Sequence, residues 1–546
     1  MASDIELKST TSKSRQGSPV DRHLAKSKVG ADDEIIWQYL TFDTELPAPS
    51  LVSHASGTMP TTPDPPNLKK YTSPFLWSYR RKLLTTIISV TATLLSAFAP
   101  GSYIAGEIQM RREWGLSVVA LSVGISVYTW GFAIAPMMLA PLSEINGRRP
   151  LFLITGAIFV LSHLVCAVTP TFAGMVIARL IGGLAGSTFS TVVGGVVSDI
   201  YHAKDRNTPM TLFSGAAIFC SGFGPAVGGL IGYHTTWRWI FWLQVIISST
   251  VILVMFFVFK ETRGSVLLSR KAKALNKWYE EMEAAGYYGV LIPPDNTPHR
   301  IRWKVKADEE RGSLGIMIGV SLYRPFHLLV TEPVVFFFSL WISFAWSVLY
   351  LMFSAIPLVF QAVYHFNLMQ YTAVFASISV AAIISTVMSI YQESLARRLM
   401  STKRLELLDS PEGRLYFCCI QSILLPIGCF WFGWTSFSSI HWIVPTLAIG
   451  CATMGIFSIY LAVFNYLADT YHRYASSALA AQSFCRNMMG GSFPLFTRQM
   501  FTAMKFHGAG SFLGGFSALL TIIPWILIFY GPQIRARSKF ASEIMH

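Results

Sequence analysis

Long apolar runs separated by short polar loops make up most of this chain. About twelve of the runs approach or exceed the roughly 20 residues that a helix needs to cross a bilayer. They cover residues 83–106, 117–141, 150–168, 172–197, 210–233, 238–259, 333–360, 371–391, 415–434, 441–466, 477–503 and 512–531. The pattern predicts an all-α membrane protein with twelve transmembrane helices.

Polar segments divide the chain into five expected parts. The first segment is rich in Ser, Thr, Pro and Lys, which predicts a disordered tail whose apolar patch at Ile35-Ile36-Trp37 docks on the rest of the protein. The expected parts are a cytoplasmic tail over 1–75, a six-helix bundle over 76–260, a charged cytoplasmic loop over 261–328, a second six-helix bundle over 329–531 and a cytoplasmic tail over 532–546.

Composition supports this division. The chain has 546 residues, of which only 13% are charged and 52% are hydrophobic, whereas soluble domains average about 25% charged residues. The net charge of +14 gathers in the N-terminal tail, the central segment and alternate loops. Loops rich in Lys and Arg face the cytoplasm, which places both termini there. A nucleic-acid partner is not expected, because no groove-reading or stacking element accompanies the basic residues.

Metal and nucleotide chemistry find no support in the sequence. Most of the seven cysteines fall inside apolar runs and lack metal-ligand spacing, so they are expected to be small buried apolar residues. No G-x-x-x-x-G-K-[ST] string occurs, which argues against an ATP-driven pump in a single chain. We therefore expect neither a metal nor a cofactor, and no enzyme activity.

Short strings repeat in the two apolar halves. The string E-x-x-small-R-R occurs at Glu144–Arg149 and again at Glu393–Arg398, and D-x-Y-H occurs at Asp199 and again at Asp469. Matches in register between two sets of six runs predict a duplicated protein, as is typical of secondary transporters.

Three segments of the chain resemble motifs of a known family. The loop Pro141–Arg149 resembles the loop motif of the major facilitator superfamily, in the form found in its twelve-span fungal drug:proton antiporters. The segment Ala178–Gly183 is similar to the fourth-span motif of that group, and Gly224–Gly229 resembles the fifth-span motif that marks antiporters. The resemblance covers about residues 75–531 and implies two pseudo-symmetric six-helix bundles. It implies an antiporter motif formed by Gly224, Pro225, Gly228 and Gly229.

The repeated charged string is a candidate gate. A carboxylate near two guanidinium groups forms strong charge-assisted hydrogen bonds, which can latch helix ends in one state and release them in another. The alternative is that the basic residues only anchor the loop on the positive side of the membrane. The expected gate residues are Glu144, Gly147, Arg148, Arg149, Glu393, Arg397 and Arg398.

Charged residues inside the runs are the strongest candidates for a transport site. A charge at the bilayer centre costs about 2.5–3.5 kcal/mol, so Arg179 is expected to serve proton coupling or to bind an anionic or carbonyl group. The alternative is a structural bond to backbone carbonyls. Arg486 is a second candidate, and Asn465 and Gln482 are expected to donate or accept hydrogen bonds in the cavity. No acidic residue lies near the centre of a run, which favours neutral or anionic organic substrates over polycations.

Aromatic residues recur at helical spacing in the seventh and tenth runs. The resemblance implies that these two spans and the first and fourth line the central cavity, where aromatic side chains suit amphipathic ligands. Packing between helices or contact with lipid is the alternative for each of them. The candidates are Trp346, Tyr350, Phe353, Phe457, Tyr460 and Phe464.

These observations together predict a secondary active transporter. We expect proton-coupled antiport that exports a small hydrophobic or amphipathic organic molecule, such as a drug, toxin, secondary metabolite or organic acid, by alternating access. The alternatives are uptake by proton symport and, in a different class, a membrane-embedded enzyme or receptor. The expected partners are a small-molecule substrate and the lipid bilayer. The expected state is a monomer in the plasma membrane, with a vacuolar or vesicular membrane as the alternative.

Overall fold

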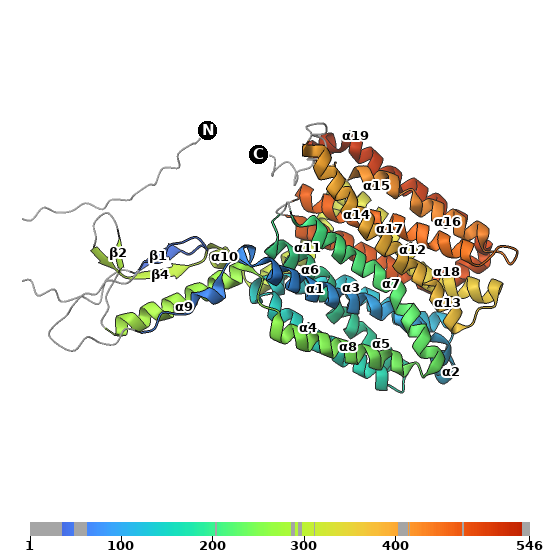
Figure 1. Ribbon diagram of the computed structural model, residues 1–546, viewed down its shortest axis with the longest axis horizontal. Helices are drawn as coiled ribbons and strands as arrows, with labels where there is room; N and C mark the ends of the chain where they lie inside the picture. Colours follow the sequence, from blue (N-terminus) through green and yellow to red (C-terminus); the bar gives the residue numbers. More distant parts are fainter. Residues whose placement is uncertain are drawn as a thin grey trace, which may run out of the picture. The chain divides into compact units, whose positions relative to one another are not determined.

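The computed structural model describes residues 35–47, 63–202, 205–285, 290–292, 297–310, 312–401, 413, 415–471 and 474–537. These residues form two compact units. The small unit takes its described residues from 1–66 and 273–304, and the large unit takes its own from 67–272 and 305–546. The large unit is a bundle of long helices that run side by side (Figure 1).

The first half of the large unit contains six membrane-length segments. Two short 3-10 helices, η1 (Leu68–Tyr71) and η2 (Pro74–Leu76), precede them, and α2 (Glu107–Trp114) joins the first two. The segments are α1 (Tyr79–Ile104), α3 (Val118–Asn146), α4 (Arg148–Val168), α5 (Phe172–Gly186) with α6 (Thr188–Ile200), α7 (Asn207–His234) and α8 (Arg238–Val258).

The second half repeats this arrangement. Its segments are α12 (Pro333–Tyr364), α13 (Leu368–Val374) with α14 (Ala376–Ser401), α15 (Tyr416–Gln421) with α16 (Leu424–Thr435), α17 (Ile443–Tyr471), α18 (Ala475–Leu520) and α19 (Ile522–Arg537). The eleventh and twelfth predicted runs meet within α18, where Lys505 has a left-handed φ of 59° that interrupts the helical geometry. Residues 475–504 of α18 are therefore the eleventh span, and the remainder continues into α19 as the twelfth.

Helix packing shows that the two halves are pseudo-symmetric. Within the first half, α1 packs along α7, α4 along α5 and α4 along α8; within the second half, α12 packs along α18, α16 along α17 and α16 along the last part of α18. Between the halves, α3 packs along α18 and α14 along α7. The second and eleventh spans and the fifth and eighth spans thus form the two seams. The predicted fold of two six-helix bundles is confirmed.

One end of the large unit carries the repeated charged string. We call the end that holds Asn146, Arg148 and Ile200 the motif end, and the end that holds Ile104, Val168 and His234 the far end. Twelve helices of the described chain are long and apolar enough to cross a membrane, with α11 counted as one and α18 with α19 as another.

The helix α11 (Leu314–Thr331) begins inside the segment that the sequence analysis assigns to the central loop. Ser313 caps it by accepting a hydrogen bond from the backbone of Ile316, and the helix continues through Pro325. Pro325 and Leu328 are buried, and α11 packs on α3 and α18, whereas Val330 is 85% exposed. The central loop therefore ends in an apolar helix that contacts both halves.

The small unit joins the N-terminal segment to the central loop. The strand β1 (Ile36–Tyr39) pairs in parallel with β4 (Ile301–Lys304), in a register that sets Ile36 opposite Ile301. A second pair consists of β2 (Val290–Ile292) and β3 (Thr297–His299). The unit also includes the last part of α9 (Gly264–Ala284), and α10 (Lys306–Glu309) follows in the large unit.

Side chains fasten this small unit together. Arg302 donates to both oxygens of Glu283, at 2.7 and 2.8 Å, and Asn276 exchanges two hydrogen bonds with the backbone of Trp303. The hydroxyl of Tyr279 donates to the carbonyl of Pro47 at 2.9 Å. The tail predicted to be disordered over 1–75 thus contains an ordered strand, and its apolar patch pairs with the central loop.

Large apolar side chains cover the outer faces of the large unit. On α4 and α8, Leu161 is 58% exposed and Phe257 is 72% exposed. A groove of about 510 Å³ between these helices is lined almost entirely by apolar side chains. Exposed apolar bands on helices of this length are typical of surfaces that contact lipid hydrocarbon.

The predicted antiporter motif lies in α7, between its own half and the opposite one. A Cβ on Gly228 would lie 3.0 Å from the carbonyl oxygen of Ser102, next to α1 of the same half. A Cβ on Gly229 would overlap the side chain of Thr372 in α13 of the other half. Gly224 faces the carbonyl oxygen of Phe98 in α1, and Pro225 is buried. The two neighbouring glycines therefore serve different contacts.

These contacts predict different effects for Gly228→Ala and Gly229→Ala. The first change overpacks α1 against α7 within one half and should cost about 1–3 kcal/mol of stability. The second clashes with the opposite half, so separation of the halves at the far end relieves it. We expect a lower thermal midpoint for Gly228→Ala, and faster amide hydrogen exchange over residues 368–376 for Gly229→Ala. Equal loss of stability in both variants, with no local change in exchange, would contradict this assignment.

Candidate functional site

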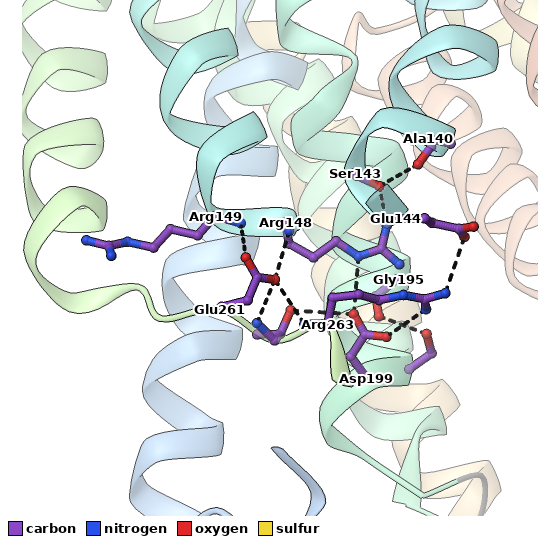
Figure 2. Close-up of polar contacts among 11 residues, drawn as sticks. Ala140, Ser143, Glu144, Arg148, Arg149, Gly195, Asp199, Glu261 and Arg263 are labelled. Carbon is purple, nitrogen blue, oxygen red and sulfur yellow. Dashed lines mark hydrogen bonds and ion pairs between the residues drawn. The ribbon is translucent and has the colours of Figure 1, made fainter. Parts of the chain in front are cut away.

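A charged cluster joins four segments of the first half at the motif end (Figure 2). Arg148 begins α4, and its Nε donates to Asp199 of α6 at 3.2 Å. Its Nη1 donates to the hydroxyl of Ser143 in α3. Arg263, which follows α8, donates to the other oxygen of Asp199 at 3.3 Å. Arg148 and Asp199 are buried, so these charge-assisted bonds are shielded from water and from salt.

Glu261 caps the start of α4. Its carboxylate accepts hydrogen bonds from the backbone nitrogens of Arg148 at 2.9 Å and Arg149 at 3.3 Å, and from those of Thr262 and Arg263. A negative charge at a helix N-terminus satisfies free N–H groups and interacts favourably with the helix dipole. Gly147 makes the approach feasible, because its φ is +98° and a Cβ would overlap the Glu261 carboxylate.

The remaining expected gate residues lie at the edge of this cluster. Glu144 does not bond Arg148 or Arg149; its carboxylate faces Arg263 at 3.9 Å and is 40% exposed. Arg149 extends away from the cluster, and its Nη2 donates to the carbonyl of Phe256 at 2.8 Å (Figure 2). The second copy of the string lies in α14, and the side chains of Glu393, Arg397 and Arg398 are outside the described residues.

Sequence reasoning overlooked three members of the cluster. Asp199, Glu261 and Arg263 supply the main partners of the loop motif, yet only Glu144 was expected to do so. The sequence did contain a signal for Asp199, because D-x-Y-H recurs at Asp469. Glu261 and Arg263 follow an apolar run and precede a charged loop, where sequence alone does not distinguish a helix cap from a solvated charge.

Arg179 of α5 is buried in the first half and is 1% exposed. Its Nε donates to the carbonyl of Gly124 at 3.2 Å and its Nη1 to that of Ala99 at 2.9 Å. The guanidinium carbon lies over the rings of Tyr103 and Tyr128, 4.6 and 4.7 Å from their centroids. These contacts hold α5 against α1 and α3, which matches the alternative expectation of a bond to backbone carbonyls.

Arg486 of α18 is the corresponding buried cation of the second half, and it is 4% exposed. Its guanidinium carbon lies 4.5 Å from the ring centroid of Trp346 and 4.8 Å from that of Tyr460. Its Nε and Nη1 have no hydrogen-bond partner among the described residues. One turn earlier, the Oε1 of Gln482 is also buried without a partner. Two of the expected site residues, Arg486 and Gln482, thus lie on one helix with buried polar atoms that have no partner among the described residues.

The expected aromatic residues separate into groups. Trp346, Tyr350 and Tyr460 lie beside Arg486, because the rings of Trp346 and Tyr460 stack with centroids 5.4 Å apart and Tyr350 lies 6.2 Å from Trp346. Phe353 continues this row and contacts Phe375.

Phe464 contacts the edge of that group, with its ring centroid 6.4 Å from that of Tyr460, and the remaining candidates make other contacts. Phe457 is buried in the core of the second half. Phe464 faces Gly194 of the first half, where a Cβ would lie 3.4 Å from the Phe464 ring. The amide of Asn465 donates to the side-chain oxygen of Asn207 in α7 at 3.1 Å. Phe464 and Asn465 therefore belong to the contact between halves.

Among the described residues, no group of three or more His, Cys, Asp or Glu side chains could hold a metal ion. The arrangement offers two buried cations, aromatic surfaces and unpaired polar atoms instead. Charge and ring contacts of this kind are suited to an organic ligand.

Comparison with known proteins agrees with this architecture. The family model of the Major Facilitator Superfamily matches residues 83–494. A major facilitator superfamily multidrug transporter of Aspergillus fumigatus is 32% identical over 481 residues, which cover 86% of this chain and 74% of that protein. A probable drug/proton antiporter of Saccharomyces cerevisiae is 29% identical, with 88% of each chain covered.

Solved structures show the same fold. The xylose transporter of Escherichia coli in a partially occluded inward-open conformation aligns with a TM-score of 0.55 at 14% identity, over 82% of this chain and 99% of that one. A human organic anion transporter aligns with a TM-score of 0.51 at 16% identity, over the same shares. With its family motifs, its two six-helix halves and these matches, the chain belongs to the Major Facilitator Superfamily and is an integral multi-pass membrane protein.

Proposed function

We propose that this protein exports a small hydrophobic or amphipathic organic molecule in exchange for protons, by alternating access between its two halves. The observation that carries the proposal is the α7 motif, whose neighbouring glycines pack against its own half on one side and the opposite half on the other. Such a helix can seal the far end and release it. Fungal relatives named as multidrug transporters and a drug/proton antiporter support the direction and the coupling.

The contacts between the halves are suited to repeated opening. They include hydrogen bonds from Asn465 to Asn207, from Ser379 to the carbonyl of Phe219 at 2.9 Å, and from the Trp130 ring to the carbonyl of Met488 at 3.3 Å. Each of these is a neutral bond, and such bonds contribute about 0.5–1.5 kcal/mol. The charged cluster, in contrast, lies wholly within the first half. It holds the ends of α3, α4 and α6 together while the halves move.

The motif end is proposed to face the cytoplasm. The loops at this end carry most of the Lys and Arg of the short loops, and such loops remain on the cytoplasmic side. Both termini then lie in the cytoplasm. The proposed setting is the plasma membrane, where a monomer driven by the proton gradient exports its substrate without a further cofactor.

Glu107 of α2 is the proposed site of proton exchange. Burial raises the pKa of its carboxyl to about 7, although Arg111 on its own helix and Arg498 of α18 oppose this shift. Tyr103 of α1 and Tyr371 of α13 also lie in its electrostatic field. Glu107 therefore lies among groups of both halves at the far end, with a pKa in the range where a carrier of protons works best.

Purified protein in liposomes tests the transport proposal. Three probes with one ring system cover the substrate classes: naphthalene-1-sulfonamide is neutral, naphthalene-1-sulfonate is anionic and 1-naphthylmethylammonium is cationic. We expect an acidic lumen to drive at least one probe inward faster than in empty liposomes, and a protonophore to abolish the difference. If all three fluxes ignore the gradient, antiport is rejected; accumulation only in the compartment that protons enter would indicate symport.

The charged cluster predicts unequal effects for two adjacent arginines. Arg148→Gln removes two buried bonds, one of them to Asp199, and should lower stability by about 1.5–3 kcal/mol, the range for hydrogen bonds to charged groups. Arg149→Gln removes one bond to a backbone carbonyl near the surface and should cost less than about 1 kcal/mol. Thermal unfolding in detergent compares the two variants. A loss for Arg149→Gln as large as that for Arg148→Gln would show that the cluster is not the stabilising element.

Replacement of Glu107 by Gln tests the proposed proton site. The carboxyl has a raised pKa in the folded state, so between about pH 4.5 and 7 the folded protein holds a proton that the unfolded chain releases. Stability should therefore fall as pH rises through this range and level off above it. In Glu107→Gln this slope should disappear, and the probe flux should lose its pH dependence between pH 5 and 8. Retention of the wild-type pH profile of flux would exclude Glu107 as the carrier.

A further inference from the structure

Arg486 is a buried cation with no anionic partner among the described residues. It is 4% exposed within an eleventh span that lies in the bundle, and no described carboxylate forms an ion pair with it. An ionised group inside a membrane protein normally pairs with an opposite charge or faces a polar cavity, because its desolvation is costly. The charge of Arg486 therefore needs a partner that is not part of the described chain.

The hydrogen-bonding capacity of Arg486 points the same way. Arg179 donates hydrogen bonds from Nε and Nη1 to backbone carbonyls, whereas Nε and Nη1 of Arg486 have no partner among the described residues. These two nitrogens lie on different sides of the guanidinium, so each can donate to an oxygen of a carboxylate or sulfonate bound beside it. Buried donors left unpaired cost free energy that a bound oxyanion would recover.

The surroundings of Arg486 fit the rest of an organic anion. Trp346 and Tyr460 place aromatic surface beside the guanidinium, and Tyr350 lies within electrostatic reach of both Arg486 and Arg179. The ring nitrogen of Trp346 and the Oε1 of Gln482 are further buried polar atoms that have no hydrogen-bond partner among the described residues. A ligand with a flat apolar body and one anionic group can use both the rings and the charge.

The site also lies on a seam between the halves. Two residues after Arg486, the carbonyl of Met488 accepts a hydrogen bond from Trp130 of α3. A Cβ on Gly491 of α18 would lie 3.0 Å from the side chain of Thr129 in α3. The helix that carries Arg486 thus belongs to the seam, so movement of α3 along α18 would be felt at the backbone that holds Arg486.

We propose that Arg486 binds the anionic group of the transported substrate, which is an organic carboxylate or sulfonate with an aromatic or other flat apolar body. The proposal rests on the transport function proposed above and narrows its substrate class. Arg179 then has a structural role in the first half, and the substrate specificity resides in the second half.

Binding of the matched naphthalene probes to purified protein in nanodiscs tests this assignment. We expect the wild type to bind naphthalene-1-sulfonate at least about tenfold more tightly than naphthalene-1-sulfonamide, since a bond to a charged group is worth one or more factors of ten. Arg486→Gln should lose this preference and keep its affinity for the sulfonamide. Arg270→Gln removes the same charge from an exposed position in α9 and should bind both probes as the wild type does.

A second variant distinguishes loss of the binding group from misfolding of the protein. Arg486→Lys retains the charge but not the forked pair of donors, so we expect sulfonate affinity between those of the wild type and Arg486→Gln. Equal affinity of the wild type for sulfonate and sulfonamide would overturn the proposal, as would wild-type sulfonate affinity in both Arg486 variants. If the binding proposal fails in this way but a pH gradient still drives flux of a neutral or cationic probe, the proposed transport function is retained. If no probe is transported, the transport function is rejected as well.

Discussion

Positive charge buried inside an apolar helical bundle is the constraint on which this structure depends. Arg179 and Arg486 each lie almost fully buried in a different half, and each lies over two aromatic rings. Aromatic faces attract a guanidinium by a cation–π interaction of up to about 2 kcal/mol or more when water is excluded. That stabilisation is of the same order as the cost of the buried charge, so the remaining donors decide what each arginine does. Arg179 donates Nε and Nη1 to backbone carbonyls, whereas the same two nitrogens of Arg486 have no partner among the described residues.

The same division between fixed and exchangeable contacts extends through the large unit. Ionic contacts at the motif end stay within the first half, where Glu261 caps α4 and Arg148 bonds Asp199. Contacts between the halves are close backbone packing at glycines and single neutral hydrogen bonds. Strong bonds thus keep a half rigid and weak bonds join the halves, which is the mechanical requirement for alternating access. The helix α11 touches α3 and α18 together and so lies across one of the seams.

Much of the fold could be predicted from the sequence because long apolar runs identify membrane helices. The twelve runs, the duplication and the resemblance of Gly224–Gly229 to a helix-packing motif all have counterparts in the structure. The helix α11 was not predicted, because Arg324 and Pro325 interrupt its apolar pattern. The pairing of Ile36–Tyr39 with Ile301–Lys304 was not predicted either, since a four-residue strand carries little signal and its partner is distant in the sequence.

The candidate site, too, was predictable from the sequence only in part. The prominence of Arg179 and Arg486 follows from the rarity of charge within spans, but their different bonding depends on which carbonyls lie nearby. Glu144 lies next to two arginines in sequence, yet the helix geometry directs Arg148 toward Asp199 and Arg149 toward Phe256. Charge partners that come from separate helices cannot be read from spacing along one of them.

The most direct measurement is an electron cryo-microscopy structure of the protein in nanodiscs with bound naphthalene-1-sulfonate. We expect a sulfonate oxygen to lie within hydrogen-bonding distance of Nε or Nη1 of Arg486, with the naphthalene ring against Trp346 or Tyr460. Density for the probe elsewhere in the bundle, with Arg486 still unpaired, would contradict it.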